Sequence, residues 1–340
     1  MTSPRVRLGA GREFDMIRAF LGADPRLPEG VEIGPGDDAA VLDGGWVVST
    51  DLAVEDVHFR RGWLTDEEIG YRAASAALSD LAAMAARPVG VLVSMAAARG
   101  AMVDVASAQA GVRAAAEAVG ARVIGGDLSR SPGPLFIDVV VLGRAEHPVS
   151  RAGAQPGDEL WVSGTLGTGG AALHIWADDR MPPEPLRRRF ARPEPRTRLG
   201  LTLGRTRVAS AMLDLSDGLA GDAGHLAAAS GVGVVIEEGL VPVDPEARAV
   251  LGDEAATEAA LHAGEDFELL FAARPGAVAA MLDDGTLDVQ VSLTRVGRIV
   301  EAPEKAGGGY DEDAPPLVLI ESPSGELRPV GRGGFDHWDD

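Results

Sequence analysis

Aspartates follow short apolar stretches at several places in this chain of 340 residues, and each stretch predicts a strand. The residues in this context are Asp51, Asp127 and Asp214, with Asp217 three residues after the last. A glycine-rich turn places Asp38 just before another apolar segment. Open α/β sheets bind ligands at the carboxyl ends of their strands. These carboxylates are therefore candidates for one common site.

A sixth carboxylate, Asp80, falls inside an expected helix that begins after Thr65. At 100° per residue from Ile69, Asp80 lies at about 20° and Met84 at about 60°, so the carboxylate lies within the apolar stripe. An unpaired carboxylate in such a place costs several kcal/mol or becomes protonated. It therefore needs a cation. The alternative is a hydrogen bond from the neighbouring backbone or from Arg72.

Six carboxylates that converge repel one another unless they bind cations. Because the chain has no cysteine and the ligands are all oxygens, the cations would be hard ones, and Mg²⁺ fits best. Mg²⁺ keeps part of its water and binds substrate phosphates, so an acidic pocket can hold an anionic nucleotide. The alternative is that these aspartates are separate loop caps on an acidic surface.

The composition excludes several classes of partner and site. The chain has 31 basic and 52 acidic residues and a net charge of −21, so nucleic acid and anionic membranes are poor partners. The absence of cysteine excludes disulfides, thiolate zinc sites and iron–sulfur clusters. No apolar run reaches the roughly 20 residues of a membrane span, and the N-terminus does not resemble a signal peptide. We therefore expect a cytoplasmic protein.

Phosphate binding cannot depend on lysine, because Lys305 is the only one and lies in a glycine-rich loop late in the chain. This excludes a Walker-type loop and a protein-kinase-type lysine. Phosphates must be bound by arginine, backbone amides or metal ions. Residues 167–172 match the dinucleotide pattern G-x-G-x-x-A, but three arginines occupy 187–189, where the pattern needs an acid. We interpret this segment as a tight turn that packs a helix on a strand.

Strands and helices alternate in the first half of the chain. The expected elements are a hairpin over 39–48, a helix over 65–86, a strand over 89–96, a helix over 103–119, a strand ending at 124 and a strand over 135–142. The helix over 65–86 begins with a capping box and ends before Pro88. Glycine and proline concentrate in 144–158, which predicts a domain boundary, and we divide the chain into domains 1–147 and 148–340.

The second half repeats this alternation. Its expected elements are a strand over 159–163, a glycine-rich turn with a helix, a strand over 211–215, a helix over 219–229, strands over 232–236, 267–272 and 289–299, and a late edge strand over 317–320. Prolines between 182 and 195 interrupt the pattern. The fold class is therefore α/β (α+β), with two domains built on mixed sheets.

The ordered set of these segments resembles the thiamine-monophosphate kinase family, part of an ATP-binding superfamily that includes aminoimidazole ribonucleotide synthetase and selenophosphate synthetase. The matching stretches are 36–39, 49–51, 57–59, 78–84, 125–127, 151–158, 214–219, 264–269 and 334–337. Single pieces are weak, but the ordered set spans nearly the whole chain. Leu128 departs from the family, which more often has threonine there, and Pro35 is a milder departure.

The resemblance implies a fold and a set of site residues. It implies an N-terminal mixed α/β domain that forms a homodimer, a C-terminal α+β domain, and an ATP groove between them. The implied magnesium ligands are Asp38, Ser49, Thr50, Asp51, Asp80, Asp127, Asp214 and Asp217, of which Asp51, Asp80, Asp127 and Asp217 are the catalytic set. The implied ATP contacts are Gly126, Asp127, Arg151 and Ser216. The implied substrate contacts are His58, Glu265 and Phe335.

The resemblance also implies the reaction, which is transfer of the γ-phosphoryl group of ATP to thiamine monophosphate with several Mg²⁺ ions. The acceptor phosphate is already ionised, so no general base is needed. Catalysis would consist of positioning and charge neutralisation, with Arg151 as the fixed positive charge. Two alternatives stay open: a related enzyme that uses ATP on another acceptor, and a non-catalytic scaffold that binds cations.

Overall fold

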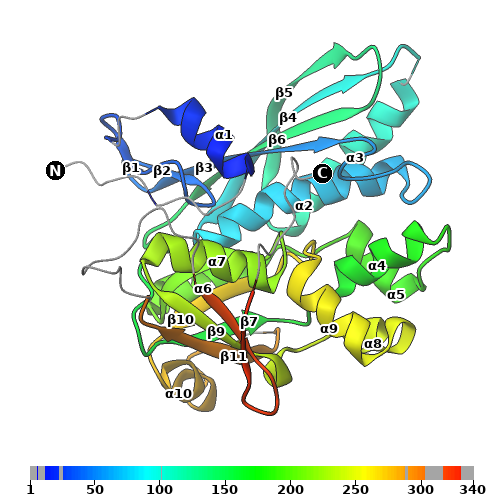
Figure 1. Ribbon diagram of the computed structural model, residues 1–340. Coiled ribbons are helices and arrows are strands. Elements are labelled where there is room, and N and C mark those ends of the chain that lie inside the picture. Colours follow the sequence, from blue (N-terminus) through cyan, green and yellow to red (C-terminus); the bar gives the residue numbers. More distant parts are fainter. Residues whose placement is uncertain are drawn as a thin grey trace.

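The computed structural model describes Val6 and residues 12–22, 26–100, 102–287, 290–302 and 317–330. Two mixed sheets, one from each half of the chain, are combined with helices (Figure 1). The expected α/β (α+β) fold class is therefore confirmed. Among the described residues, no helix combines the length and the apolar character that a membrane crossing requires.

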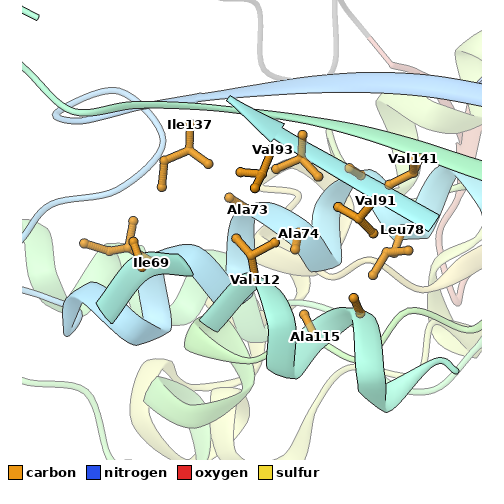
Figure 2. Packing of buried hydrophobic residues seen from close by; sticks show 14 of the residues in the cluster. Ile69, Ala73, Ala74, Leu78, Val91, Val93, Val112, Ala115, Ile137 and Val141 are labelled. Carbon is orange, nitrogen blue, oxygen red and sulfur yellow. The ribbon is translucent and has the colours of Figure 1, made fainter. Parts of the chain in front are cut away.

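The first sheet has six strands in the order β1-β2-β3-β6-β4-β5. Their bounds are β1 Val31–Ile33, β2 Ala40–Leu42, β3 Trp46–Val54, β4 Arg87–Ala97, β5 Arg122–Arg130 and β6 Phe136–Arg144, and the helices of this half are α1 Arg12–Leu21, α2 Asp66–Ala83 and α3 Met102–Ala118. β4 and β5 pair in parallel, and the other neighbours pair antiparallel. The side chains of Val93, Ile137 and Val141 pack against α2 and α3 on one face of this sheet (Figure 2).

α2 begins at the expected capping box. The Thr65 hydroxyl accepts the N–H of Glu68 at 3.3 Å, and the Glu68 carboxylate accepts the N–H of Thr65 at 2.9 Å. Glycines let α2 and α3 touch at their backbones, because a Cβ on Gly111 would lie 1.9 Å from the carbonyl oxygen of Glu67. A Cβ on Gly70 would likewise lie 1.9 Å from the carbonyl oxygen of Ala108. This close crossing fixes the position of α2 under the sheet.

The second sheet has seven strands in the order β13-β12-β9-β11-β7-β10-β8. Their bounds are β7 Glu159–Ser163, β8 Ala209–Asp214, β9 Gly233–Glu237, β10 Leu269–Ala273, β11 Leu293–Val300, β12 Val318–Glu321 and β13 Leu327–Pro329. The helices are α4 Thr168–Ala177, α5 Glu184–Ala191, α6 Thr197–Thr206, α7 Leu219–Ser230, α8 Pro245–Leu251, α9 Asp253–His262 and α10 Ala277–Asp283, with a short 3₁₀ helix at Glu238–Leu240. β12 pairs in parallel with β9, so this sheet is mixed as well.

The last turn of α2 joins the two halves. Ala82 and Ala85 share one buried apolar cluster with Leu203 of α6 and Phe271 of β10. A Cβ on Gly200 of α6 would lie 2.0 Å from the carbonyl oxygen of Ala82, so these backbones also touch. The turn of α2 that carries Asp80 is therefore held between the first sheet and the second half of the chain.

Two strand ends differ from the sequence prediction. β3 continues through Asp51 to Val54, and β5 continues through Asp127 to Arg130. Only Asp214 lies at the carboxyl end of its strand, so the predicted placement of the other two was wrong. The reason is pairing, because β3 pairs residue by residue with β6 along its whole length. A charged side chain does not end a strand whose backbone groups still have partners.

Other elements also differ. Residues 317–320 were expected to form an edge strand, but β12 lies between β9 and β13, because a turn at 322–325 adds β13 outside it. The interrupted stretch at 182–195 contains α5 and the start of the segment leading to α6, with Pro185 in the first turn of α5. Proline is tolerated there because the first N–H groups of a helix have no partner inside it. The expected boundary at 147/148 lies between β6 and β7 and stays a prediction.

Candidate active site

Three carboxylates from distant segments meet where the two halves join. They are Asp38 from the turn before β2, Asp80 from the last turn of α2, and Asp214 from the end of β8. One oxygen of each lies within 4.8 Å of the others, and we call these three residues the acid cluster. The hydroxyl of Ser49 lies 2.6 Å from Asp80 Oδ2 and 3.1 Å from the carbonyl oxygen of Asp38.

Burial and mutual repulsion raise the pKa values in this region. Burial, followed by the charge of Asp38, raises the pKa of Asp214 to about 7. Burial, followed by the charges of Asp214 and Asp38, raises the pKa of Asp80 well above its usual range. Asp51, beside them on β3, has its pKa raised to about 6 by burial and then by the charge of Glu265. A bound cation would relieve this repulsion and keep the carboxylates ionised.

Arg151 places a positive charge next to the acid cluster. Its Nη2 donates to Asp38 Oδ1 at 2.7 Å, and its backbone N–H donates to Asp37 Oδ1 at 3.1 Å. The Ser150 hydroxyl donates to the other carboxylate oxygen of Asp37. Asp38 Oδ2 is buried and has no hydrogen-bond partner among the described residues. A buried oxygen without a donor, within reach of two other carboxylates, is a suitable ligand for a hard cation, so this donor set fits Mg²⁺.

A second acidic group lies at the start of α7. Its members are Asp217, Asp222 and His225, each with a ligand atom within 4.8 Å of the others. Asp222 Oδ2 accepts the backbone N–H of Asp217 at 3.1 Å, and His225 Nε2 lies 3.7 Å from Asp217 Oδ2. Burial, then the charges of Asp217 and Asp214, raises the pKa of Asp222 well above its usual range. The charge of Asp214 links this group to the acid cluster.

Glu265 belongs to a loop that is tied to the segment after β8. Its N–H donates to the carbonyl oxygen of Ser216 at 2.9 Å, and the N–H of Phe267 donates to that of Leu215 at 2.8 Å. Gly264 is required here, because a Cβ would lie 2.1 Å from the Ser216 carbonyl oxygen. The structure thus places Ser216, expected to contact ATP, next to Glu265, expected to contact the substrate.

The carboxylate of Glu265 pairs with Arg72, a buried residue of α2. The sequence left Arg72 open as a partner of Asp80, but the hydroxyl of Ser49 is the hydrogen-bond donor to that carboxylate. Arg72 also lowers the pKa of Asp51, against the larger effect of burial. Arg72 therefore lies between the residue expected to bind substrate and one expected to bind metal.

His58 lies in the turn that follows β3. Its Nδ1 accepts the backbone N–H of Val54 at 3.1 Å, which fixes the orientation of the ring. Its contact with an anionic substrate stays a prediction. Phe335 lies outside the described residues.

The structure does not bring Gly126 or the side chains of Thr50 and Asp127 to the acid cluster. Across the first sheet Asp51 aligns with Val139, Val93 and then Gly126, so three strand spacings, about 14 Å, separate its Cα from that of Gly126. Asp127 aligns instead with Asp138, on the face opposite the helices, and the Thr50 hydroxyl donates to Asp138 at 2.7 Å. Within one chain, β5 is therefore remote from the acid cluster.

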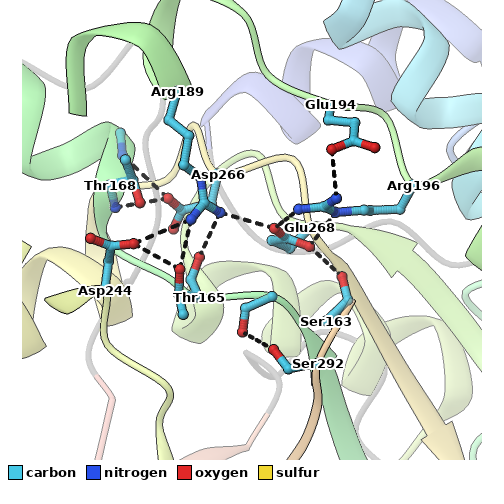
Figure 3. A network of polar contacts seen from close by, with 12 residues as sticks. Ser163, Thr165, Thr168, Arg189, Glu194, Arg196, Asp244, Asp266, Glu268 and Ser292 are labelled. Atoms are coloured by element: carbon cyan, nitrogen blue, oxygen red, sulfur yellow. Dashed lines mark hydrogen bonds and ion pairs between the residues drawn. The ribbon is translucent and has the colours of Figure 1, made fainter. Parts of the chain in front are cut away.

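The glycine-rich turn at 167–172 is closed by a carboxylate of the protein itself. Asp266 accepts the backbone N–H groups of Gly167, Thr168 and Gly169 at 2.7, 3.0 and 3.2 Å. These N–H groups begin α4, and a helix N-terminus of this kind otherwise binds phosphate. Figure 3 shows Asp266 next to the ion pairs of Glu268 with Arg189 and Arg196. The turn thus packs α4 against α9 and not against a strand as predicted, since a Cβ on Gly167 would lie 3.0 Å from the backbone nitrogen of Ala260. Its N–H groups are already paired.

The sequence analysis missed two polar residues near the site, Asp222 and His225, and considered Arg72 only as a partner of Asp80. Asp222 and His225 were assigned no role, although Asp222 lies among alanine, glycine and leucine in a helical segment. The signal that singled out Asp80, a carboxylate on an apolar helical face, would also have found Asp222. Nothing in the sequence could pair Arg72 with Glu265, because 193 positions separate them and only tertiary packing brings them together.

Two family models match this chain. The AIR synthase related protein N-terminal domain covers residues 36–145, and the C-terminal domain of the same name covers residues 155–307. A relative from Rhodopirellula baltica called thiamine-monophosphate kinase is 35% identical over 302 residues, which are 85% of this chain and 89% of the relative.

Solved structures show the same likeness. A structure described as AaThiL complexed with AMPPCP and TMP has a TM-score of 0.77 and 29% identity, and the match covers 96% of both chains. The thiamine-monophosphate kinase of Stenotrophomonas maltophilia K279a has a TM-score of 0.71 and 32% identity, covering 96% of this chain and all (100%) of that chain.

Proposed function

This chain belongs to the thiamine-monophosphate kinase family of AIR synthase related proteins, and on that premise we propose that it phosphorylates thiamine monophosphate with ATP. The products are thiamine diphosphate and ADP. The relatives of this name and the AaThiL complex with AMPPCP and TMP support the proposal. The single structural observation that carries it is the acid cluster, with Arg151 beside it and Glu265 close by.

Asp38, Asp80 and Asp214 would hold Mg²⁺, with Ser49 and Asp51 beside them and Asp217 at the second acidic group. When bound, the ions neutralise the phosphate oxygens and favour in-line displacement at the γ-phosphorus. Arg151 contributes a fixed positive charge. Asp38 orients its guanidinium, and Asp37 accepts its backbone N–H. An arginine held in this way loses little entropy when it binds a phosphate.

The acceptor needs no general base from this chain. A phosphate monoester is ionised at neutral pH, so its oxygen attacks the γ-phosphorus while the bond to the ADP oxygen breaks. The chain must therefore position the acceptor and keep water from competing. We assign acceptor positioning to Glu265, His58 and Phe335, and nucleotide contact to Ser216. Ser216 and Glu265 are linked through their backbones, which would set the two substrates beside each other.

We also propose a homodimer that completes the site. β5 is an edge strand, and its apolar side chains Ile124 and Leu128 are 59% and 54% exposed. An uncovered edge with exposed apolar residues is a surface that another strand can cover. Because Asp127 is remote from the acid cluster of its own chain, Gly126 and Asp127 of the partner subunit would supply the contacts expected of them. We propose further that the chain divides into domains 1–147 and 148–340 and that the protein is cytoplasmic.

The test is release of ADP by the purified protein with ATP, Mg²⁺ and thiamine monophosphate. We expect Mg²⁺-dependent ADP release with a matching amount of thiamine diphosphate. Thiamine without its phosphate is the matched control, since it lacks the ionised nucleophile. Faster turnover of a different phosphorylated acceptor in direct competition would favour another member of the superfamily. No ADP release with any acceptor would favour a binding protein.

A further inference from the structure

Arg72 is held in one orientation by two segments of the second half. Its side chain is buried, with only 6% of the residue exposed. Nη1 donates to the carbonyl oxygen of Phe190, and Nη2 donates to Oε2 of Glu265. The guanidinium also lies over the ring of Phe190, with 3.6 Å from Cζ to the ring centroid, and 5.5 Å from the ring of Phe267. A planar fork bound at two ends and stacked on a ring has little freedom left.

Arg72 binds one carboxylate oxygen of Glu265, whose backbone has an unusual conformation. Glu265 has φ +66°, a left-handed conformation that costs a non-glycine residue roughly 1 kcal/mol, and Phe267 has φ +51°. The Glu265 side chain is 28% exposed, so it reaches the solvent-accessible side of the loop. Oε2 is engaged by Arg72, whereas Oε1 has no hydrogen-bond partner among the described residues. One oxygen is thus fixed and the other is available to a ligand.

The same cation also interacts with Asp51. The charge of Arg72 acts on Asp51 as well as on Glu265, and the two carboxylates act on each other. A buried arginine needs a compensating carboxylate, because removing one partner of a buried ion pair leaves an uncompensated charge. Arg72 therefore lies between Asp51, which is expected to bind metal, and Glu265, which is expected to bind the acceptor.

From this geometry we propose that Arg72 is a positioning residue for the acceptor. It holds the Glu265 carboxylate so that Oε1 faces an acceptor carrying a cationic ring or an N–H donor, which thiamine monophosphate has in its thiazolium and aminopyrimidine. Arg72 itself does not touch the acceptor. This inference rests on the proposed function and goes beyond it, because it names the residue on which acceptor selection depends.

The test compares Arg72→Lys, Glu265→Gln and the double variant. Lysine keeps the charge but cannot make both hydrogen bonds in the planar geometry of the fork. Losing a hydrogen bond to a charged group raises a dissociation constant about tenfold or more. We therefore expect Arg72→Lys to raise both the KM and the calorimetric Kd for thiamine monophosphate about tenfold, with the KM for ATP within about twofold. The double variant should bind the acceptor no more weakly than Glu265→Gln alone, since Arg72 acts through Glu265.

Arg192→Gln is the matched control. The Arg192 guanidinium lies 4.7 Å from the ring centroid of Tyr71 and pairs with Glu67 at 3.0 Å, so it makes the same two kinds of contact outside the site. We expect unchanged KM values for this variant. If Arg72→Lys does not fold, Glu265→Asp withdraws the carboxylate by one methylene and should show the same selective rise in the acceptor KM.

The outcomes separate the two proposals. If the wild type neither binds nor phosphorylates thiamine monophosphate, the proposed function is wrong. If the wild type is active but folded Arg72→Lys keeps its acceptor Kd, or if both KM values rise equally, the positioning role of Arg72 is wrong. Additive losses in the double variant would show that Arg72 acts independently of Glu265, which also overturns the inference.

Discussion

At the scale of single residues, the candidate site contains more negative charge than its arginine compensates. The acid cluster and Asp51 lie next to one another, and Arg151 donates to only one oxygen of Asp38. The raised pKa values of Asp80 and Asp214 follow from burial first and from the neighbouring carboxylates second. The ion-free protein should therefore be under electrostatic strain that a bound divalent cation removes.

Asp80→Asn tests this at one residue. We expect it to lower turnover by roughly 100-fold or more, because several kcal/mol of transition-state charge stabilisation are lost. The fold should survive, since the amide can still accept the hydrogen bond from Ser49 and one source of repulsion is removed. ADP release and thermal melting with and without MgCl₂ check this. Mg²⁺ should raise the melting temperature of the wild type but not of the variant.

Asp51→Asn should behave in the same way as Asp80→Asn. NaCl at matched ionic strength is the control for the melting experiments, because it screens the acid cluster without binding as a divalent ligand. Near-normal activity in both variants would contradict the assignment of Mg²⁺ to this cluster.

At the scale of elements, α2 links the parts of the site. Its N-terminus is joined to α5 by Glu68, which accepts hydrogen bonds from Arg187 at 3.1 and 2.6 Å. Its middle carries Arg72 and its last turn carries Asp80. Contacts along the whole length of α2 therefore set the position of Glu265, which pairs with Arg72, relative to the acid cluster, which includes Asp80.

The ion pair of Glu68 predicts a pH dependence of stability. Burial alone would raise the pKa of Glu68, but the hydrogen bonds from Arg187 and Thr65 outweigh it and lower the pKa to about 2. Because the folded pKa lies below the unfolded value, this stabilisation is complete above about pH 4.5 and is lost as the pH falls toward 2. Wild type and Glu68→Gln should thus differ by about 1–2 kcal/mol in the free energy of unfolding at pH 7.

Urea denaturation at a series of pH values measures this difference. It should shrink steadily below pH 4.5, and a difference that stays constant down to pH 3 would contradict the ion-pair explanation. Glu184→Gln is the matched control, because Glu184 pairs with the same Arg187 but has a side chain that is 70% exposed. It should change stability by less than about 0.5 kcal/mol.

The crossing of α2 and α3 predicts the effect of a single methyl group. In Gly111→Ala the new Cβ would meet the carbonyl oxygen of Glu67, and that oxygen belongs to the backbone and cannot move aside alone. We expect a loss of about 1–3 kcal/mol or more in the free energy of unfolding, measured with urea. Gly133→Ala is the control, because a Cβ on Gly133 would meet nothing within 4 Å among the described residues, and it should be near neutral. Equal stability of the two variants would contradict the close crossing.

At the scale of the whole molecule, the site needs contributions from both halves of the chain and, by our proposal, from a second copy. Asp38 and Asp80 come from the first half, Asp214 and Arg151 from the second, and Asp127 would serve the partner. The mixed sheets hold these residues at fixed positions, since β8 and α2 pack in one buried cluster.

Mixing two inactive variants tests the shared site. A dimer of one Asp51→Asn and one Asp127→Asn subunit has one site with both defects and one with neither, if Asp127 serves the partner. Refolding the variants together should form such dimers in half of the molecules and restore about a quarter of wild-type activity. No recovery, with heterodimers shown by a tagged subunit, would place Asp127 in its own chain's site.

A disrupted edge should have a related effect. Leu128→Arg places a charge on the exposed edge strand, so sedimentation should show a monomer with little activity. Met181→Glu is the control, because this apolar residue is 63% exposed in the second half, and the variant should stay dimeric and active.

Local sequence patterns alone predicted many of the helices and strands of this protein and one residue of its candidate site. Capping chemistry predicted the start of α2 at Thr65, and period-two and helical patterns predicted most strands and helices of the first half. The apolar stripe around Asp80 singled out a carboxylate that the fold places beside two others. These features could be predicted because they depend on neighbours a few positions away along the chain.

Only the tertiary structure decided which distant side chains meet. Strand pairing with β6 extended β3 beyond Asp51. The register of the first sheet placed Gly126 about 14 Å from Asp51 and aligned Asp127 with Asp138 on the other face, although Asp51 and Asp127 follow similar apolar stretches. Arg72 met Glu265 rather than Asp80, because α2 packs against the second half of the chain. Local patterns specify elements, whereas contacts between residues far apart in the chain depend on how complete helices and sheets pack, and that information is spread over the whole sequence.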